Sequence, residues 1–138
     1  MKVLMLNGSC NPKGCTYTAL TEVGKTLTSA GIDYEIVQLD GGPVRDCIGC
    51  NQCSKNGCVF TDDGVNDFIA KARQADGFVF GTPVYYAHPS GRVLSFLDRV
   101  FYAGGSAFAG KPGAAVASAR RAGTTASLDA LGGEMGKN

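Results

Sequence analysis

The sequence predicts an α/β fold in which a parallel sheet is covered by helices on both faces. Short apolar runs alternate along the chain with segments whose apolar residues recur at helical spacing. The runs are almost continuously hydrophobic, as is typical of parallel strands buried on both faces. Twenty glycines and the lack of tryptophan suit tight turns between strands and helices. We expect residues 1–138 to form a single domain with a cysteine-rich insertion at about residues 41–63.

Composition narrows the functional classes. With 138 residues, 44% of them hydrophobic, the chain is long enough to bury a core. Thirteen basic and twelve acidic residues leave a net charge of +1, which does not favour nucleic acid or an anionic membrane as a partner. No apolar run approaches the roughly 20 residues of a membrane span, and the first run lacks the flanks of a signal peptide. We therefore expect a cytoplasmic protein.

The first half of the chain contains two predicted strands. Residues Lys2–Leu6 form the first strand, and a helix begins near Cys15 or Thr16. A second strand covers Tyr34–Leu39, and the irregular residues 40–63 that follow exceed the usual length of a loop in an α/β fold. The apolar face of the first helix comprises Leu20, Val23, Leu27 and Ala30, and Gly31 can terminate it.

The second half continues the alternation. Asp62 or Asp63 can cap a helix, strands are predicted at Gly77–Gly81 and Gly113–Ser118, and a weaker helix starts near Thr125. We expect the final stretch, residues 132–138, to lack order. The apolar stripes of the two middle helices are Val65, Phe68, Ile69 and Ala72 in one, and Val93, Phe96, Leu97, Val100 and Phe101 in the other.

The loop after the first strand has the composition of a phosphate site. Gly8 and Gly14 permit unusual backbone angles, and the loop offers the short polar side chains of Ser9, Asn11 and Thr16. The amides and positive dipole end of the following helix point into it, which suits a phosphate monoester such as that of FMN. Neither G-x-G-x-x-G nor G-x-x-x-x-G-K-[ST] fits the loop. An ordinary turn with Thr16 as helix cap is the alternative.

Two other loops are expected to share this site. In a parallel sheet of order 2-1-3-4, ligands bind beyond the carboxyl ends of strands 1 and 3, where the strand order reverses. The loop of residues 81–91 carries Tyr85 and Tyr86, whose rings could pack on a flat cofactor or simply cover core. The loop of residues 118–124 offers backbone amides and two arginines, although paired surface arginines are more often just solvated.

Four cysteines form the pattern Cys47-x2-Cys50-x2-Cys53-x4-Cys58. This spacing is close to the cysteine runs that ligate iron–sulfur clusters. Structural zinc fits less well, because it prefers two separated C-x2-C pairs. Cluster binding, reduced or redox-active thiols and zinc all stay open. Cys10 and Cys15 lie in the first loop, where small packing residues are expected.

Three motifs together resemble the NADPH-dependent FMN reductase family, which has a flavodoxin-like fold. They are Ser9-x-Asn11-x-x-Gly14-x-Thr16, then Gly81-Thr82-Pro83-Val84-Tyr85, then Ser90-Gly91 with Phe96-Leu97-Asp98-Arg99. The resemblance covers nearly the whole chain. The cysteine spacing resembles the iron–sulfur flavoprotein branch of that family, in which a [4Fe–4S] cluster lies beside FMN.

The resemblance implies which residues hold the cofactor. Ser9, Asn11, Gly14, Cys15 and Thr16 would hold the FMN phosphate; Thr82, Pro83, Val84, Tyr85 and Tyr86 would line the ribityl chain and ring; and residues 118–123, including Ser118, Arg120 and Gly123, would form the third wall. Many relatives have Arg where this chain has Asn11, which leaves Lys13 as the nearby cation. Cys47, Cys50, Cys53 and Cys58 would hold the cluster. No catalytic side chain is required, because the flavin carries the reaction, and His88 receives no role.

By this resemblance the chain is expected to transfer hydride from NAD(P)H through FMN to a quinone, flavin or similar acceptor. The alternative is an electron carrier that relays single electrons from a ferredoxin-like partner through the cluster to FMN. Relatives are generally dimers or tetramers, so a homo-oligomer is expected. The flavodoxin strand order 2-1-3-4-5 calls for one more strand and helix. Either the chain is cut short, or a partner covers the exposed edge.

Overall fold

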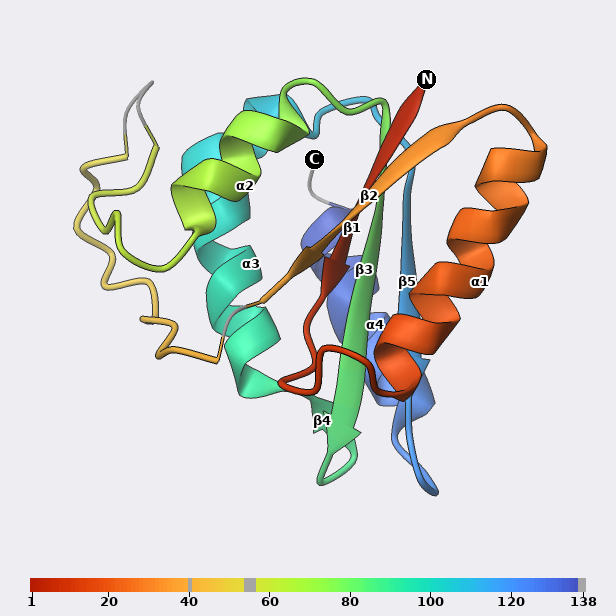
Figure 1. Cartoon of the computed structure of the whole chain (residues 1–138). Coiled ribbons are helices and arrows are strands. Elements are labelled where there is room, and N and C mark those ends of the chain that lie inside the picture. Colours follow the sequence, from red (N-terminus) through yellow and green to blue (C-terminus); the bar gives the residue numbers. More distant parts are fainter. Residues whose placement is uncertain (40, 54–56, 137–138) are drawn as a thin grey trace.

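A computed structural model describes residues 1–39, 41–53 and 57–136 of the chain. Strands and helices alternate as predicted, with a parallel sheet at the centre (Figure 1). The elements are β1 (Lys2–Asn7), α1 (Cys15–Ser29), β2 (Asp33–Gln38), α2 (Val65–Ala72), β3 (Gly77–Tyr85), β4 (His88–Pro89), α3 (Gly91–Gly104), the 3₁₀ turn η1 (Gly105–Ala107), β5 (Gly113–Ser118) and α4 (Thr124–Met135).

The sheet has the predicted order. Four parallel strands run β2-β1-β3-β5, and the short β4 pairs antiparallel with the end of β3. The register places Asn7 of β1 beside both Gln38 and Gly81, and it places Pro83 beside Ser118. The loops that follow β1, β3 and β5 therefore leave from one edge of the sheet.

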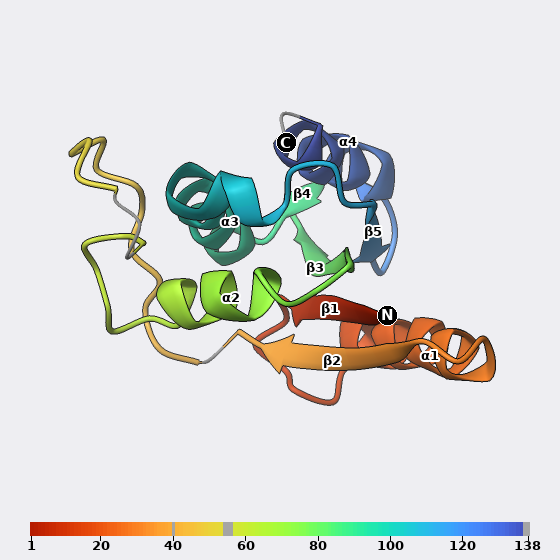
Figure 2. The ribbon, with the colours of Figure 1, turned by 90° about the horizontal axis from the view of Figure 1, so that it is seen from above.

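Helices cover both faces of the sheet. Figure 2 shows α1 on one side and α2, α3 and α4 on the other. Alternate residues of β1 point to opposite faces, because side chains in a strand have a period of two. Met5 packs in the core beneath α1, whereas Leu4 and Leu6 belong to the larger core beneath the other three helices. This division explains why the strands read as continuous apolar runs.

Most predicted faces are confirmed. The stripe Val65, Phe68, Ile69 and Ala72 is buried, and so are Val93, Phe96, Leu97 and Val100 of α3, with Phe101 partly buried. In α1, Leu20 is buried, but Ala30 is exposed as the residue after the helix. That assignment was wrong because the helix ends at Ser29, one residue before Ala30 could complete the stripe.

Several predicted boundaries need correction. The loop expected after Gly81 is in part a continuation of β3 to Tyr85, which turns back as β4. Neither Asp62 nor Asp63 caps α2, since its N-cap is Gly64 in a left-handed conformation (φ 76°). The stretch expected to lack order is helical as far as Met135, because α4 packs against the larger core through Leu131 and Met135. Residues 137–138 lie outside the described part.

Strands β2 and β5 form the two outer edges of the parallel sheet. Within the described residues, β5 pairs with β3 and with no further strand. Among the helices of residues 1–39, 41–53 and 57–136, none combines the length and apolar character that a membrane crossing needs.

Candidate functional site

The first loop, residues 7–14, is shaped by its own polar side chains. Asn7 is fully buried, and its Oδ1 accepts a hydrogen bond from the Ser9 amide at 3.3 Å. Ser9 Oγ accepts from the Asn11 amide at 3.1 Å, and Asn11 Oδ1 accepts from the Lys13 amide at 3.1 Å. Each side chain thus bonds the backbone two residues further on, as in Asx and Ser turns. The sequence itself sets the curvature of this loop.

Gly8 joins this loop to the sheet. Its amide donates to the Gly81 carbonyl at 2.8 Å. A Cβ atom at Gly8 would lie 2.1 Å from Val93 Cγ2 and 2.7 Å from the Gly81 oxygen, so no other residue fits without movement. The close approach fixes the first loop against both β3 and α3.

Helix α1 begins where the first loop ends. Its N-cap is Gly14, and no side chain caps the helix. The amides of the first turn and the positive end of the helix dipole therefore face the loop. Thr16 lies in this turn and is buried, whereas Asn11, Lys13 and Cys15 are exposed. The alternative in which Thr16 caps the helix is wrong, because the N-cap is Gly14 and the Thr16 hydroxyl bonds Ser118.

The three predicted loops do meet, which confirms the convergence expected from the strand order. The hydroxyls of Thr16 and Ser118 share a hydrogen bond of 2.7 Å, which joins the start of α1 to the end of β5. Cys10 Sγ lies 3.7 Å from Tyr85 Oη, and this contact joins the first loop to β3. The hydrogen bond with Cys10, together with burial, raises the pKa of the Tyr85 hydroxyl.

The second loop is a β-hairpin that sequence reasoning missed. Tyr86 and Ala87 form its two-residue turn, with φ of 49° and 63°. Positive φ is costly for residues other than glycine, and such turns usually contain Asn-Gly. The sequence shows no such signal. Backbone strain of this kind is often found at functional sites. Gly123 of the third loop packs tightly here, because a Cβ on it would lie 2.4 Å from Ala87 Cα.

The hairpin residues differ in how freely they face solvent. Tyr86 is fully exposed, Tyr85 is about half exposed, and Pro83 and Val84 are partly buried. Thr82 is buried, and its hydroxyl donates to the Pro83 carbonyl at 2.9 Å and accepts from the Ser90 amide at 3.1 Å. Thr82 thus holds the hairpin together. In the third loop, Arg120 is exposed and Gly123 has φ of 94°.

The cysteine segment, which the structure describes at residues 41–53 and 57–63, contains the other predicted constellation. Cys47, Cys50, Cys53 and Cys58 are free thiols, and all four line one hollow together with apolar residues and Arg99. Burial and the three neighbouring cysteines raise the pKa of Cys53. Across residues 1–39, 41–53 and 57–136, no three His, Cys, Asp or Glu side chains are placed to hold a metal ion together. The sequence pattern brings the thiols near one another without forming a finished site.

The donor set of this hollow still suits an iron–sulfur cluster. Four thiols, apolar neighbours and an N–H donor to sulfur are the features that such clusters use. The hollow itself measures about 20 Å³, which is room for about one water molecule. The segment would have to move outward to enclose a cluster.

The part of the cysteine segment that sequence reasoning missed is its charged anchor. Asp63 and Arg99 form an ion pair, and their side chains are 3% and 1% exposed. Asp63 was expected to cap α2, but its carboxylate pairs with the arginine of α3 instead. The sequence signal for this ion pair was the Phe96-Leu97-Asp98-Arg99 motif. The motif indicated a family resemblance but not the role of Arg99.

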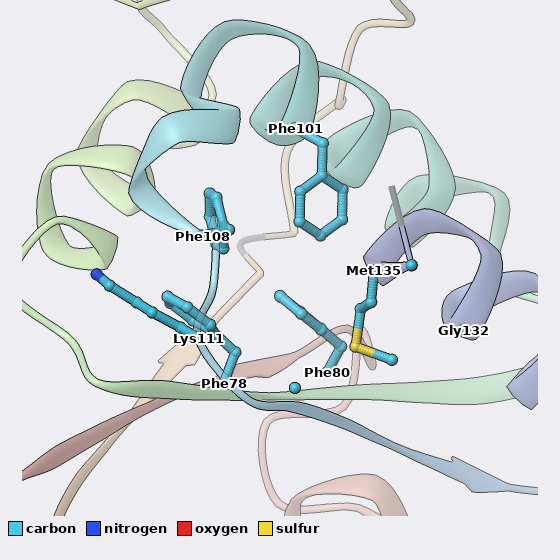
Figure 3. A pocket seen from close by; sticks show the side chains of 9 residues that line it. Phe78, Phe80, Phe101, Phe108, Lys111, Gly132 and Met135 are labelled. Atoms are coloured by element: carbon cyan, nitrogen blue, oxygen red, sulfur yellow. The ribbon is translucent and has the colours of Figure 1, made fainter. Parts of the chain in front are cut away.

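A separate apolar pocket lies on the face of the sheet beneath α3 and α4. Figure 3 shows Phe78, Phe80, Phe101 and Phe108 around it, with Met135 on one side and Lys111 on another. Its volume is about 300 Å³. The pocket reaches Gly113 at the start of β5, so it lies toward the amino ends of the strands, away from the three loops.

Comparison with known proteins settles the family. The family model for NADPH-dependent FMN reductase matches residues 1–132. The chain belongs to this family. It is 35% identical over 100 residues to an iron–sulfur flavoprotein of Methanocaldococcus jannaschii, covering 72% of this chain and 51% of the relative. An iron–sulfur flavoprotein of Archaeoglobus fulgidus is 33% identical over 99 residues, with 72% and 48% covered. The chain therefore spans about half the length of these relatives.

Solved structures of the family's fold are also similar. A flavone reductase superposes with a TM-score of 0.74 at 17% identity, covering 97% of this chain and 49% of the other. An archaeal flavodoxin gives 0.67 at 14% identity, with 99% and 74% covered. An NAD(P)H:quinone oxidoreductase from Methanothermobacter marburgensis gives 0.68 at 16%, with 96% and 72% covered. At these identities the likeness establishes the flavodoxin-like fold.

Proposed function

We propose that the chain binds FMN at the three loops and serves as an NAD(P)H-dependent oxidoreductase. The observation that carries this proposal is the meeting of the three loops beside the N-terminus of α1, which no side chain caps. When bound, the flavin would accept hydride from NAD(P)H and pass electrons to a quinone, a flavin or a similar acceptor. Family membership supports the choice of cofactor.

The residues of the first loop suit a singly esterified phosphate. Hydroxyls of Ser9 and Thr16 and the amides of the first helical turn are neutral donors, and Lys13 is the cation in this loop. Hydrogen bonds to a charged group are the stronger kind. Asn11 takes the place where many relatives have arginine, so the amides and hydroxyls carry more of the binding.

The other two loops would hold the rest of the cofactor. Tyr85 and Tyr86 present ring surface at the hairpin, and aromatic rings pack well against a flat heterocycle. In the third loop, Gly123 packs against Ala87 of the hairpin and Ser118 bonds Thr16, so backbone amides of this loop would be available to polar edges of the ring. These residues would bind and orient the flavin, which would accept hydride from a nicotinamide.

The phosphate assignment is tested by titrating the flavin-free chain with FMN. We expect the double variant Ser9→Ala, Thr16→Ala to weaken FMN binding by about tenfold or more, since each lost bond to a charged group costs about 1.5–3 kcal/mol. Thr28→Ala is the control, because Thr28 is an exposed threonine at the far end of α1. Equal affinity in all three proteins would show that the phosphate lies elsewhere.

A second candidate function rests on the cysteine segment. Four free thiols around one hollow, and the iron–sulfur flavoproteins among the relatives, favour a [4Fe–4S] cluster on Cys47, Cys50, Cys53 and Cys58. Such a cluster would supply single-electron transfer from a ferredoxin-like donor. Anaerobic reconstitution with ferrous iron and sulfide, followed by iron analysis, tests this. About four irons per chain would support the cluster, whereas a chain that takes up no iron would contradict it.

A further inference from the structure

Arg99 is a buried charge that the proposed hydride chemistry does not use. It lies on α3, and its guanidinium meets the Asp63 carboxylate with both terminal nitrogens, the Nη2–Oδ1 distance being 3.1 Å. Burial alone would lower the pKa of Arg99, but hydrogen bonds with Asp63 and Cys58 outweigh it and raise that pKa. Arg99 therefore stays charged. Because burying two charges is costly, such a pair is by itself weak evidence for stability.

The remaining donors of Arg99 reach both ends of the cysteine pattern. Nη1 donates to the carbonyl of Arg45 at 3.2 Å, two residues before Cys47. Nε donates to Cys58 Sγ at 3.3 Å, and Nη2 approaches the Phe60 carbonyl at 3.4 Å. One side chain from α3 thus connects the chain before the first cysteine of the pattern to the last cysteine itself.

Cys58 is also held through its backbone. Asn66 of α2 accepts from the Cys58 amide at 2.7 Å and donates to the Cys58 carbonyl at 2.8 Å. Cys58 is partly buried between these two helices, whereas Cys47 and Cys53 are exposed. The four cysteines are therefore not equivalent: Cys58 is held by contacts from α2 and α3, whereas Cys47 and Cys53 line the same hollow but are exposed.

We propose that Arg99 is a positioning residue that makes Cys58 the preorganised thiol of the segment, around which the other three cysteines rearrange when a cluster binds. The inference deepens the second candidate function and rests on it for the ligand. Arg99 contacts the Cys58 thiol and the chain at Arg45, while Asn66 holds the Cys58 backbone. An N–H donated to a ligating sulfur also adjusts a cluster's reduction potential, because it favours the more negative, reduced form.

The first arm of the test uses the chain without metal. Hydrogen exchange of the backbone amides of residues 57–63 is compared in the unaltered chain, in Arg99→Lys and in Arg45→Lys. Arg45 is the matched control, because its guanidinium lies 4.9 Å from the same Phe60 ring that Arg99 approaches at 5.0 Å, yet it is exposed and pairs with exposed Asp62. We expect about tenfold faster exchange in Arg99→Lys and little change in the control. Equal exchange in all three would overturn the proposal.

The second arm uses chain reconstituted anaerobically with ferrous iron and sulfide. We expect Arg99→Lys to lose iron to a chelator faster and to shift the midpoint potential to more negative values, with Arg45→Lys unchanged. An unchanged potential and loss rate in Arg99→Lys would overturn the positioning role. If the unaltered chain takes up no iron, the proposed cluster fails, and the exchange arm still decides whether Arg99 fixes Cys58.

A second variant guards against misfolding of Arg99→Lys. The double change Arg99→Gln, Asp63→Asn replaces the buried ion pair by a neutral amide pair, so that no charge is left unpaired. It also removes the donor to Cys58 Sγ. The same faster exchange at residues 57–63 is expected, and normal exchange would again overturn the proposal.

Discussion

The first loop and the cysteine segment both follow strands at the carboxyl edge of the sheet, yet different interactions hold them. Polar side chains of the first loop bond amides two residues away, from Asn7 to Ser9 and from Ser9 to Asn11. The cysteine segment is held by side chains from helices outside it, chiefly Arg99 of α3, 41 residues from Cys58, and Asn66 of α2, eight residues from it. Figure 1 shows the segment running outward beside these two helices. The short loop is shaped by its own side chains, whereas the longer segment also depends on side chains from the two helices beside it.

The largest effect on stability is expected from one of two neighbouring aspartates in the cysteine segment. Asp63→Asn leaves Arg99 buried without its partner, so we expect unfolding free energy to fall by about 3–5 kcal/mol. Asp62→Asn breaks an ion pair with Arg45 whose side chains are 51% and 60% exposed, and should cost less than about 1 kcal/mol. Urea unfolding of both variants gives the difference. Similar losses would mean that the buried pair does not anchor the segment.

A second pair of variants contrasts glycines of the two regions. Gly8→Ala drives a methyl group into Val93 and the Gly81 carbonyl, and should cost about 1–3 kcal/mol. It should also weaken FMN binding, because the first loop must shift. Gly42 of the cysteine segment has no atom within 4 Å of an added Cβ, so Gly42→Ala should change stability by less than about 0.5 kcal/mol. Thermal unfolding checks both, and a tolerated Gly8→Ala would contradict the close packing described.

This contrast also shows what the sequence could predict. Local periodicity predicted the apolar stripe on α2 and the strand Gly113–Ser118. The rule for ligand sites in parallel sheets predicted that the three loops meet. The Tyr86–Ala87 turn did not, because neither residue signals positive φ. The role of Arg99 did not either, since its partners lie 36 and 41 residues away and only packing brings them together. Local rules describe the first loop better than the cysteine segment.

The smallest effect is expected for substitutions on α4, away from the first loop and the cysteine segment. They test whether α4 is independent of these two regions. Gly132 lines the pocket between α3 and α4, and nothing lies within 4 Å of an added Cβ there. Gly132→Ala should stabilise the chain by about 0.5 kcal/mol through helix propensity. Neither FMN affinity nor hydrogen exchange at residues 57–63 should change. Gly133→Ala, also in open space on α4 but outside the pocket lining, should give a similar gain. A loss of FMN binding in either variant would contradict this independence, because it would show that α4 affects the first loop.

The most direct test of the central claim compares FMN with riboflavin, which lacks the phosphate. If the first loop holds a phosphate monoester through amides and hydroxyls, the flavin-free chain should bind one FMN. Riboflavin should then bind about tenfold or more weakly, because the bonds to a charged group are lost. Titration monitored by quenching of flavin fluorescence measures both affinities. Equal affinity for the two flavins, or no binding of FMN at all, would contradict the account.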